Sequence, residues 1–372
     1  MPESSKQHSG SPYLITTKRL NFFRHERRLF VISLLAIGLT GCPNLDTVKS
    51  DAGTADSSVA GVEDGASADT PPVENDTAEK GNGSDGQSSV KDIGGVRTPG
   101  DVGDEEVPAS PLTRVRIVAA NLSSGKKQSW DPGHGQRILQ GLVPDIVLMQ
   151  EFNKGDNSPT TIKKFVKDMC GDGFSFYRES GSAIPNGIIS RYPIIASGSW
   201  DDALSKNREF AWARIDVPGP TDLWAISLHL LTSKSSVRAK QVTQLVAYIK
   251  QNVPEDDFLV VGGDLNTTSF SEQSLNGFNG LLDRTRRPVD QAGNGHTNSP
   301  RNKPYDRLFA DFDLEPHGVP VKLGAQEFKN GLVFDSRVFT PLIDVTPAMK
   351  EDSGAEAMQH MAIVRDFALP TP

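Results

Sequence analysis

Seven polar residues of the types that perform acid–base and metal chemistry fall at or near the ends of predicted strands. They are Asn121, Glu151, His229, Asp264, Asn266, Asp306 and His360. Taken singly, each has an ordinary explanation, because asparagine and aspartate often close turns and a lone strand histidine is often a core residue. Taken together, they match the needs of phosphodiester hydrolysis: charge neutralisation at the phosphoryl oxygens, an activated water, and an acid for the leaving oxygen.

The chemistry of each residue type limits its role in such a site. The Glu151 carboxylate is a hard oxygen ligand of the kind that Mg²⁺ takes, together with several waters. His229 and His360 titrate near neutral pH, so they can exchange protons or stabilise anionic oxygens. Aspartate and asparagine side chains can orient the water and the histidines. In FLVVGGDLNTT (258–268), an apolar run and two glycines lead directly into such a pair, and the glycines let the backbone bend sharply.

The elements that must position these residues are visible as hydrophobic patterns. Strands are predicted at 114–122, 145–152, 187–200, 208–217, 223–231, 258–262, 305–310 and 360–367. Helices are predicted at 134–143, 159–169 and 235–251. In the last helix, Ser235 or Ser236 is the expected N-cap. Strands outnumber helices and partly alternate with them, which favours mixed sheets with helices outside.

In these motifs and in their order along the chain, the sequence resembles the endonuclease/exonuclease/phosphatase superfamily, the fold of pancreatic deoxyribonuclease. The resemblance covers essentially all of 112–372. The matching motifs are VRIVAANL (115–122), PDIVLMQE (144–151), NGIISRYPI (186–194), SLHL (227–230), SSVRAKQ (235–241), GGDLN (262–266), PYDRLFAD (304–311) and QHMAIVRDF (359–367).

The resemblance implies a fold and a set of roles. The fold is an α/β four-layer sandwich, α/β/β/α, with the site at one edge of the packed sheets. Glu151 would bind the metal with help from Asn121. The metal would be Mg²⁺, with Mn²⁺ or Ca²⁺ as alternatives. The remaining roles comprise orientation of water and phosphate by Asp264 and Asn266, acid–base catalysis by His229 and His360, orientation of His360 by Asp306, and substrate binding by Asn186, Arg191 and Arg238.

The sequence departs from the family pattern near its closing motif. Gln359 stands where the family has an aspartate before the histidine, which places a second metal site in doubt. The family also supports its first histidine with a glutamate from a neighbouring strand. Arg208 and Glu209 lie near that point, and the sequence does not fix which of them faces the site. Asp352 is a candidate substitute for the missing carboxylate.

The first 41 residues have the pattern of a secretory signal, with a basic stretch before the apolar run 29–41. LTGC (39–42) resembles a bacterial lipobox, which implies cleavage after Gly41 and lipidation of Cys42. We therefore expect a membrane lipoprotein, anchored in the outer membrane if the cell has two, and facing the periplasm or the exterior. Cys170 would then be the only other cysteine, a small buried residue without a disulfide.

Residues 42–111 form a predicted disordered acidic linker. Between 43 and 111 there are 15 acidic and 4 basic residues and no aromatic residue, so this segment cannot bury enough apolar surface to fold. The remaining segment, 112–372, is long enough for one large domain. Its net charge is close to zero, so bulk charge does not indicate a nucleic-acid binder.

Three functions remain open at this stage. The first is a metal-dependent phosphodiesterase, most readily a monomeric nuclease acting on DNA or RNA. The second is a phosphomonoesterase or a phospholipid or sphingomyelin phosphodiesterase, for which the membrane anchor is an argument. The third is a non-catalytic binding domain. Loop cations that favour a nuclease are Lys126, Lys127, Arg284, Arg286, Arg287, Arg301 and Lys303.

Overall fold

A computed structural model describes residues 111–371 of the chain. The predicted signal segment, the predicted lipidation site at Cys42 and all but the last residue of the predicted linker lie outside this range. Among the described residues, no helix is both long and apolar enough to cross a membrane.

Two large β-sheets form the centre of the described part. The strands of the first sheet are β1 (Leu112–Ala120), β2 (Ile146–Met149), β3 (Ser175–Arg178), β4 (Gly187–Ser190), β11 (Gly318–Val319), β14 (Leu332–Phe334) and β15 (Ala362–Pro370). Their order is β11-β15-β1-β2-β4-β3, with β14 also paired to β15.

The second sheet has a simpler, nearly sequential order. Its strands are β5 (Ile194–Trp200), β6 (Phe210–Ile215), β7 (Leu223–His229), β8 (Phe258–Asp264), β9 (Leu282–Asp283) and β10 (Asp306–Asp311), and the order is β5-β6-β7-β8-β10-β9. A separate hairpin consists of β12 (Val321–Leu323) and β13 (Gln326–Phe328).

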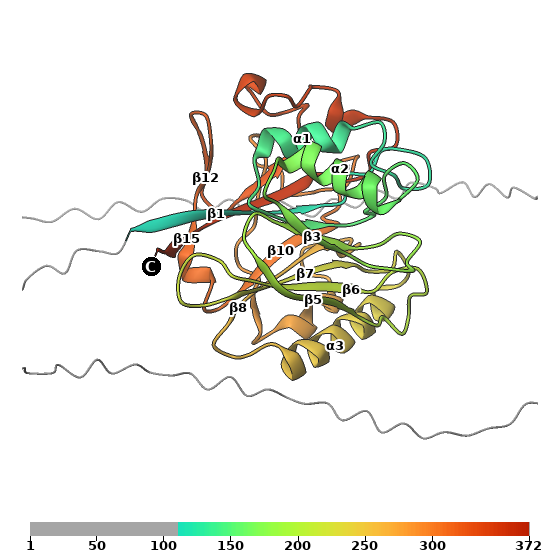
Figure 1. Cartoon of the computed structure of the whole chain (residues 1–372), viewed down its shortest axis with the longest axis vertical. Helices are drawn as coiled ribbons and strands as arrows, with labels where there is room; N and C mark the ends of the chain where they lie inside the picture. The colour runs from blue at the N-terminus through green and yellow to red at the C-terminus, as the bar shows by residue number, and fades with distance from the viewer. Residues whose placement is uncertain (1–110, 372) are drawn as a thin grey trace, which may run out of the picture. The chain divides into compact units, whose positions relative to one another are not determined.

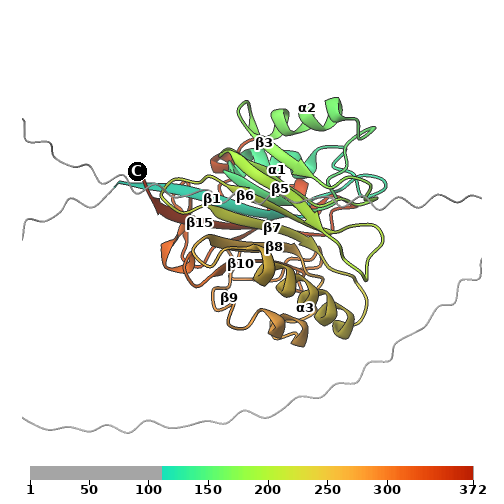
Figure 2. The same ribbon diagram turned by 60° about the horizontal axis from the view of Figure 1, so that its bottom comes forward.

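Helices cover the outer faces of both sheets (Figure 1). The α-helices are α1 (His134–Leu142), α2 (Pro159–Cys170) and α3 (Ser235–Asn252). Short 3₁₀ helices are η1 (Gln273–Phe278), η2 (Glu315–His317), η3 (Leu342–Val345) and η4 (Asp352–Gly354). Both views place α1 and α2 on the first sheet and α3 on the second (Figure 2).

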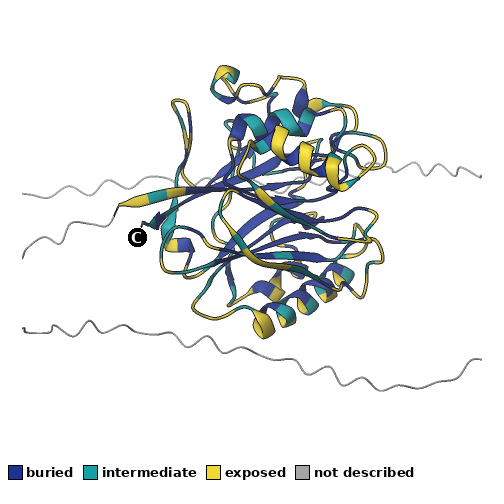
Figure 3. Cartoon of the chain, in the orientation of Figure 1, coloured by how far each residue is buried: buried dark blue, intermediate teal, exposed yellow. Residues whose placement is uncertain are grey.

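Three apolar layers hold these elements together, because alternate side chains of a strand point to opposite faces. On β1, Val115 and Ile117 pack between the sheets, whereas Val118 packs beneath α1 and α2. On β7, Ala225 points between the sheets and Ile226 toward α3. The central strands of both sheets are therefore buried on both faces (Figure 3), which explains their nearly continuous apolar sequences. The predicted α/β/β/α sandwich is confirmed.

Two local predictions are wrong. The stretch 187–200 is not one strand but two, β4 and β5, which belong to different sheets. The hydroxyl of Ser190 donates to the carbonyl of Tyr192 and accepts from its N–H, which forms a tight turn, and Pro193 then lacks a donor to continue a ladder. At α3, the N-cap is Lys234 without a side-chain cap, rather than a serine.

The remaining differences are small elements that the sequence pattern did not reveal. β3, β9 and β11–β14 have only two to four residues each, too few for a period-two pattern to be distinctive. Cys170 is only half-buried and packs against the cluster under α1 and α2. Burial raises the pKa of its thiol to about 12, so it is an unreactive packing residue.

Candidate active site

All seven strand-end residues meet at one edge of the two sheets. β1 and β2 run parallel, and so do β7 and β8, so each pair ends at the same edge. At that edge His229 is the register partner of Asp264, which is in turn the partner of Asp306 on antiparallel β10. Each of the seven side chains is at most 7% exposed. Buried polar groups need partners, and here they find them in one another.

Asp264 is at the centre of the cluster. Its Oδ2 atom accepts hydrogen bonds from the side-chain amides of Asn121 (3.2 Å) and Asn266 (3.1 Å). The Nε2 atoms of His229 and His360 lie 3.2 and 3.5 Å from the same oxygen. Its Oδ1 accepts from the backbone N–H of Asn266 at 2.8 Å. Nitrogen atoms from four segments thus converge on this single carboxylate oxygen and fix its position.

Glu151 lies beside this centre, just after β2. One of its oxygens accepts from the hydroxyl of Ser123, and the other from Asn121 (3.4 Å) and Gln128 (3.1 Å). Its backbone has φ 51, a left-handed conformation that costs a non-glycine residue energy and that clusters at functional sites. This backbone turns the carboxylate away from the strand and into the cluster.

His360 is oriented by Asp306, as the resemblance implies. Its Nδ1 lies 3.0 Å from Oδ2 of Asp306. The backbone N–H of Asp306 donates to the hydroxyl of Thr297 at 2.8 Å, and the carbonyl of Thr297 accepts from the N–H of Met361. The Tyr305 ring packs against the imidazole with a centroid distance of 5.7 Å. The position of this histidine is therefore fixed from several sides.

The glycine before Asp264 is required by close packing. Gly263 has φ 136, and a Cβ atom there would lie 2.2 Å from the carbonyl oxygen of Leu228 and 2.6 Å from Nε2 of Gln150. Asn266 also has a positive φ, 51, which asparagine tolerates better than most residues. The sharp exit of β8 that the two glycines predict is therefore present.

The two histidines have opposite charge preferences. Burial, with the cations Arg208 and His360 nearby, lowers the pKa of His229 well below 6.5, so it is neutral near neutral pH. Burial also lowers the pKa of His360, but Asp306 and the other two carboxylates of the cluster outweigh it and raise that pKa to about 10. One imidazole is therefore held neutral and the other protonated, the split expected of an acid–base pair.

Burial also shifts the pKa values of two carboxylates of the cluster, Glu151 and Asp264. Burial raises the pKa of Glu151, against the hydrogen bond from Ser123. Burial also raises the pKa of Asp264, helped by the negative charge of Asp306. A buried group of carboxylates that favours protonation is a group that an added cation would stabilise.

The residues present fit a divalent cation. The Oδ1 atom of Asn121 is buried next to the Glu151 carboxylate and has no hydrogen-bond partner within residues 111–371. Asp264, Asp306 and His360 also offer three possible ligand atoms that lie within 4.8 Å of one another. Carboxylate and amide oxygens are the ligands that Mg²⁺, Mn²⁺ and Ca²⁺ take. The predicted ligands Glu151 and Asn121 are therefore well placed.

Arg208 is the site residue whose position the sequence left open. Its guanidinium donates to the backbone carbonyls of His229 and Leu230. The carboxylate of Glu209 instead accepts a hydrogen bond from the hydroxyl of Ser199. Nδ1 of His229 is buried and forms no hydrogen bond with any residue between 111 and 371, so neither Arg208 nor Glu209 takes the role of the supporting glutamate of the family. The only sequence feature that pointed to Arg208 is its place at the start of the predicted strand 208–217.

Ser123 and Gln128 were also missed. Both contact Glu151, and both lie after β1 within 123–129, a run of small and polar residues. Ser123 follows Asn121 by two positions, so alternation could have placed the two side chains on the same face.

The three predicted substrate-binding residues do not line the cluster. Arg191 is exposed and pairs at 3.0 Å with Asp145, which precedes β2 and so lies at the opposite end of that strand from Glu151. Arg238 is buried in a bidentate ion pair with Glu272. Asn186 is fully buried and donates to the carbonyl of Glu209. Arg238 and Asn186 therefore hold segments of the fold together, and Arg191 lies away from the cluster.

Three other residues singled out from the sequence lie outside the cluster: Asp352, Gln359 and Arg301. Asp352 does not replace the missing carboxylate, because it pairs with Arg137 on α1. Gln359 is exposed, and its backbone carbonyl accepts from the N–H of Ser299. Of the predicted loop cations, Arg301 is used internally, in ion pairs with Asp290 and Asp335.

Comparison with known proteins identifies the family of the chain. The model of the Endonuclease/Exonuclease/phosphatase family matches residues 119–324, more than half of the chain. No curated protein sequence matches significantly.

Several solved structures resemble the described part. Humanized D. rerio TDP2 is 18% identical, with a TM-score of 0.46, and the match covers 68% of this chain and 98% of that one. An endonuclease/exonuclease/phosphatase from Beutenbergia cavernae is 19% identical, with a TM-score of 0.46 and coverage of 69% and 72%. An endonuclease/exonuclease/phosphatase family protein from Bacteroides thetaiotaomicron is 15% identical, with a TM-score of 0.47 and coverage of 69% and 98%.

Proposed function

Because the chain belongs to the endonuclease/exonuclease/phosphatase family, a family of phosphoric ester hydrolases, we propose that it is a Mg²⁺-dependent phosphodiesterase that cleaves DNA or RNA. The observation that carries the proposal is the convergence of two histidines and two asparagine amides on Asp264. A phosphodiester bound beside Asp264 would find both histidines and both amides close to it.

The proposed roles follow from the contacts. Glu151 and Asn121 would hold the metal, which when bound polarises a phosphoryl oxygen. Asp264, with Asn266 fixing its carboxylate, orients the attacking water. His360, kept protonated by Asp306, donates to the leaving oxygen.

His229 completes the set as the proton acceptor. Its lowered pKa keeps it neutral, and Arg208 fixes its backbone. General acid–base catalysis of this kind contributes about 10²- to 10⁴-fold to the rate.

A panel of substrates tests this function. The protein would be incubated with plasmid DNA, RNA, bis(4-nitrophenyl) phosphate and sphingomyelin, each with Mg²⁺ and with EDTA. We expect metal-dependent cleavage of a nucleic acid that is lost in Glu151→Ala and in His360→Ala. Cleavage of the lipid alone would instead assign the protein to the phospholipid phosphodiesterases, and no turnover by folded protein would indicate a binding domain.

The membrane anchor remains a proposal that rests on the LTGC motif (39–42). We propose that lipidated Cys42 tethers a monomeric domain to the outer membrane through the acidic segment 43–111. Fractionation of cells that express the full chain tests it: the wild type should sediment with membranes, and Cys42→Ser should not. Equal distribution of both proteins would exclude the anchor.

A further inference from the structure

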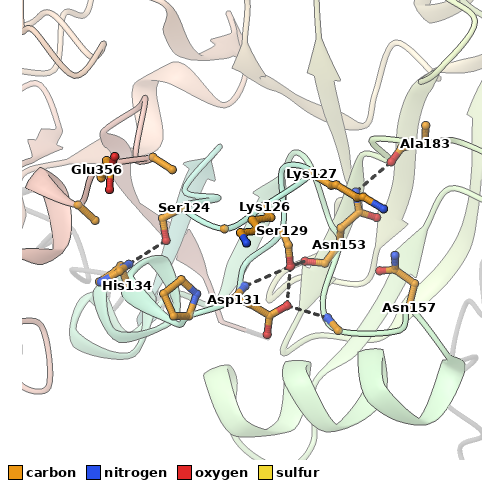
Figure 4. A pocket seen from close by; sticks show the side chains of 15 residues that line it. Ser124, Lys126, Lys127, Ser129, Asp131, His134, Asn153, Asn157, Ala183 and Glu356 are labelled. Carbon is orange, nitrogen blue, oxygen red and sulfur yellow. Dashed lines mark hydrogen bonds between the residues drawn. The ribbon is translucent and has the colours of Figure 1, made fainter.

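A large cavity opens beside the proposed metal ligand. It has a volume of about 970 Å³ and is lined mainly by two loops, 124–134 and 153–157 (Figure 4). Ser124 in its wall follows Ser123, which donates to Glu151. Asn153 in the same wall donates its backbone N–H to the carbonyl of Glu151 at 2.6 Å. The walls of the cavity and the catalytic carboxylate are therefore parts of the same two loops.

The first loop presents two lysines from a rigid turn. The N–H groups of Ser124 and Gly125 both donate to the carbonyl of Ser129, and Trp130 is completely buried beneath the loop. Lys127 has φ 57 and the next residue φ 56, two consecutive left-handed residues that an unconstrained loop would avoid. Gln128 ties the same turn to Glu151 at 3.1 Å.

The cavity lining carries two lysines, Lys126 and Lys127, on one side and the carboxylate of Glu356 on the other. Lys126 and Lys127 are exposed and form no ion pair with any residue between 111 and 371. Asp131, by contrast, is paired with Lys154 at 3.0 Å and accepts from the N–H of Gly155. Among the described residues, the unpaired charges of the lining are therefore two ammonium groups and the single carboxylate of Glu356. The two ammonium groups are suited to phosphate oxygens as mobile point charges.

Size and charge together identify the class of ligand. The volume lies at the upper end of the range of small-molecule sites, so it holds more than a single phosphate. A phosphate carried by a further nucleotide would meet both lysines, and its sugar and base would have room beside the hydroxyl and amide groups of Ser124 and Asn157. The trimethylammonium group of sphingomyelin, placed next to its scissile phosphodiester, would instead face the two lysines as like charges.

We propose that this cavity is a subsite for the nucleotide next to the scissile phosphodiester, with Lys126 and Lys127 binding its phosphate. The inference rests on the proposed function and narrows it, because it makes the substrate a polynucleotide rather than a choline lipid or a single phosphodiester. Lys126 and Lys127 are binding residues in this scheme, and Gln128 is a positioning residue.

The test compares Lys126→Ala/Lys127→Ala with the control Lys240→Ala/Lys250→Ala, which removes two exposed charges from α3. The first readout is equilibrium binding of a fluorescent single-stranded oligonucleotide in EDTA, which needs no turnover. We expect Kd to rise about tenfold or more in the loop variant only. The log–log salt dependence should become shallower by about 1 to 2.

The second readout is turnover with Mg²⁺. The loop variant should lose at least tenfold more kcat/KM on the oligonucleotide than on bis(4-nitrophenyl) phosphate. Equal losses on both substrates, or binding equal to that of the α3 control, would overturn the subsite. Lysine-dependent binding without any turnover would leave the subsite standing and refute the nuclease. Turnover that does not depend on the two lysines would support the nuclease and refute the subsite.

Discussion

Glu179 is a buried carboxylate whose ionisation should destabilise the fold. It is completely buried just after β3, and one of its oxygens accepts the backbone N–H of Glu209 at 3.1 Å. Burial raises its pKa from 4.5 to about 7. Replacement by glutamine keeps the shape and an acceptor oxygen but removes the ionisation.

The sign and size of the effect of Glu179 on the free energy of unfolding follow from proton linkage. Below pH 4.5 both the folded and the unfolded states carry the proton, so Glu179 adds no pH dependence there. Between pH 4.5 and 7 only the unfolded state releases it, so the free energy of unfolding falls by about 1.4 kcal/mol per pH unit. At pH 8 the accumulated loss is about 3 kcal/mol, and Glu179→Gln should be free of it.

Urea unfolding at pH 4.5, 6, 7 and 8 measures this effect in the wild type, Glu179→Gln and the exposed control Glu255→Gln. The stability of Glu179→Gln relative to the wild type should rise by about 3 kcal/mol from pH 4.5 to 8. The control should run parallel to the wild type. A constant difference between Glu179→Gln and the wild type across this range would refute the raised pKa and the reasoning from burial.

Three further outcomes are expected. Removal of divalent metal with EDTA should abolish turnover and Mg²⁺ should restore it; activity that survives exhaustive chelation would contradict a metal mechanism. Gly263→Ala should destabilise by about 2 kcal/mol more than Gly280→Ala in urea unfolding, since only the former would contact the Leu228 carbonyl; equal effects would show that backbone strain alone matters. Arg238→Ala should lower the free energy of unfolding by about 3–5 kcal/mol by leaving Glu272 buried and unpaired; unchanged stability with a raised KM would return Arg238 to substrate binding.

The sequence predicted the layers and the cluster well, because both rest on strong local signals. Long apolar strands and one-sided helices identify which elements are buried on which face. The residues after strand ends are then brought together by the parallel pairs β1–β2 and β7–β8. Family motifs correctly placed Glu151, Asp264 and His360 in one cluster.

The remainder depends on tertiary contacts that no local pattern encodes. Arg238 matches a family motif, yet its ion pair with Glu272 is visible only once η1 packs beside α3. The direction of Arg208 depends on the backbone carbonyls it meets at the end of β7. Gln128 looks like an ordinary loop residue until its turn is seen to fold back onto Glu151.

The central claim is that Glu151 supports metal-dependent phosphodiester hydrolysis at the Asp264 cluster. The most direct measurement is the Mg²⁺ dependence of kcat/KM for bis(4-nitrophenyl) phosphate in the wild type and in Glu151→Gln, with equal folding verified by circular dichroism. We predict saturable activation by Mg²⁺ in the wild type and a loss of about 10²-fold or more in the variant. Equal, metal-independent rates in both proteins would contradict the account.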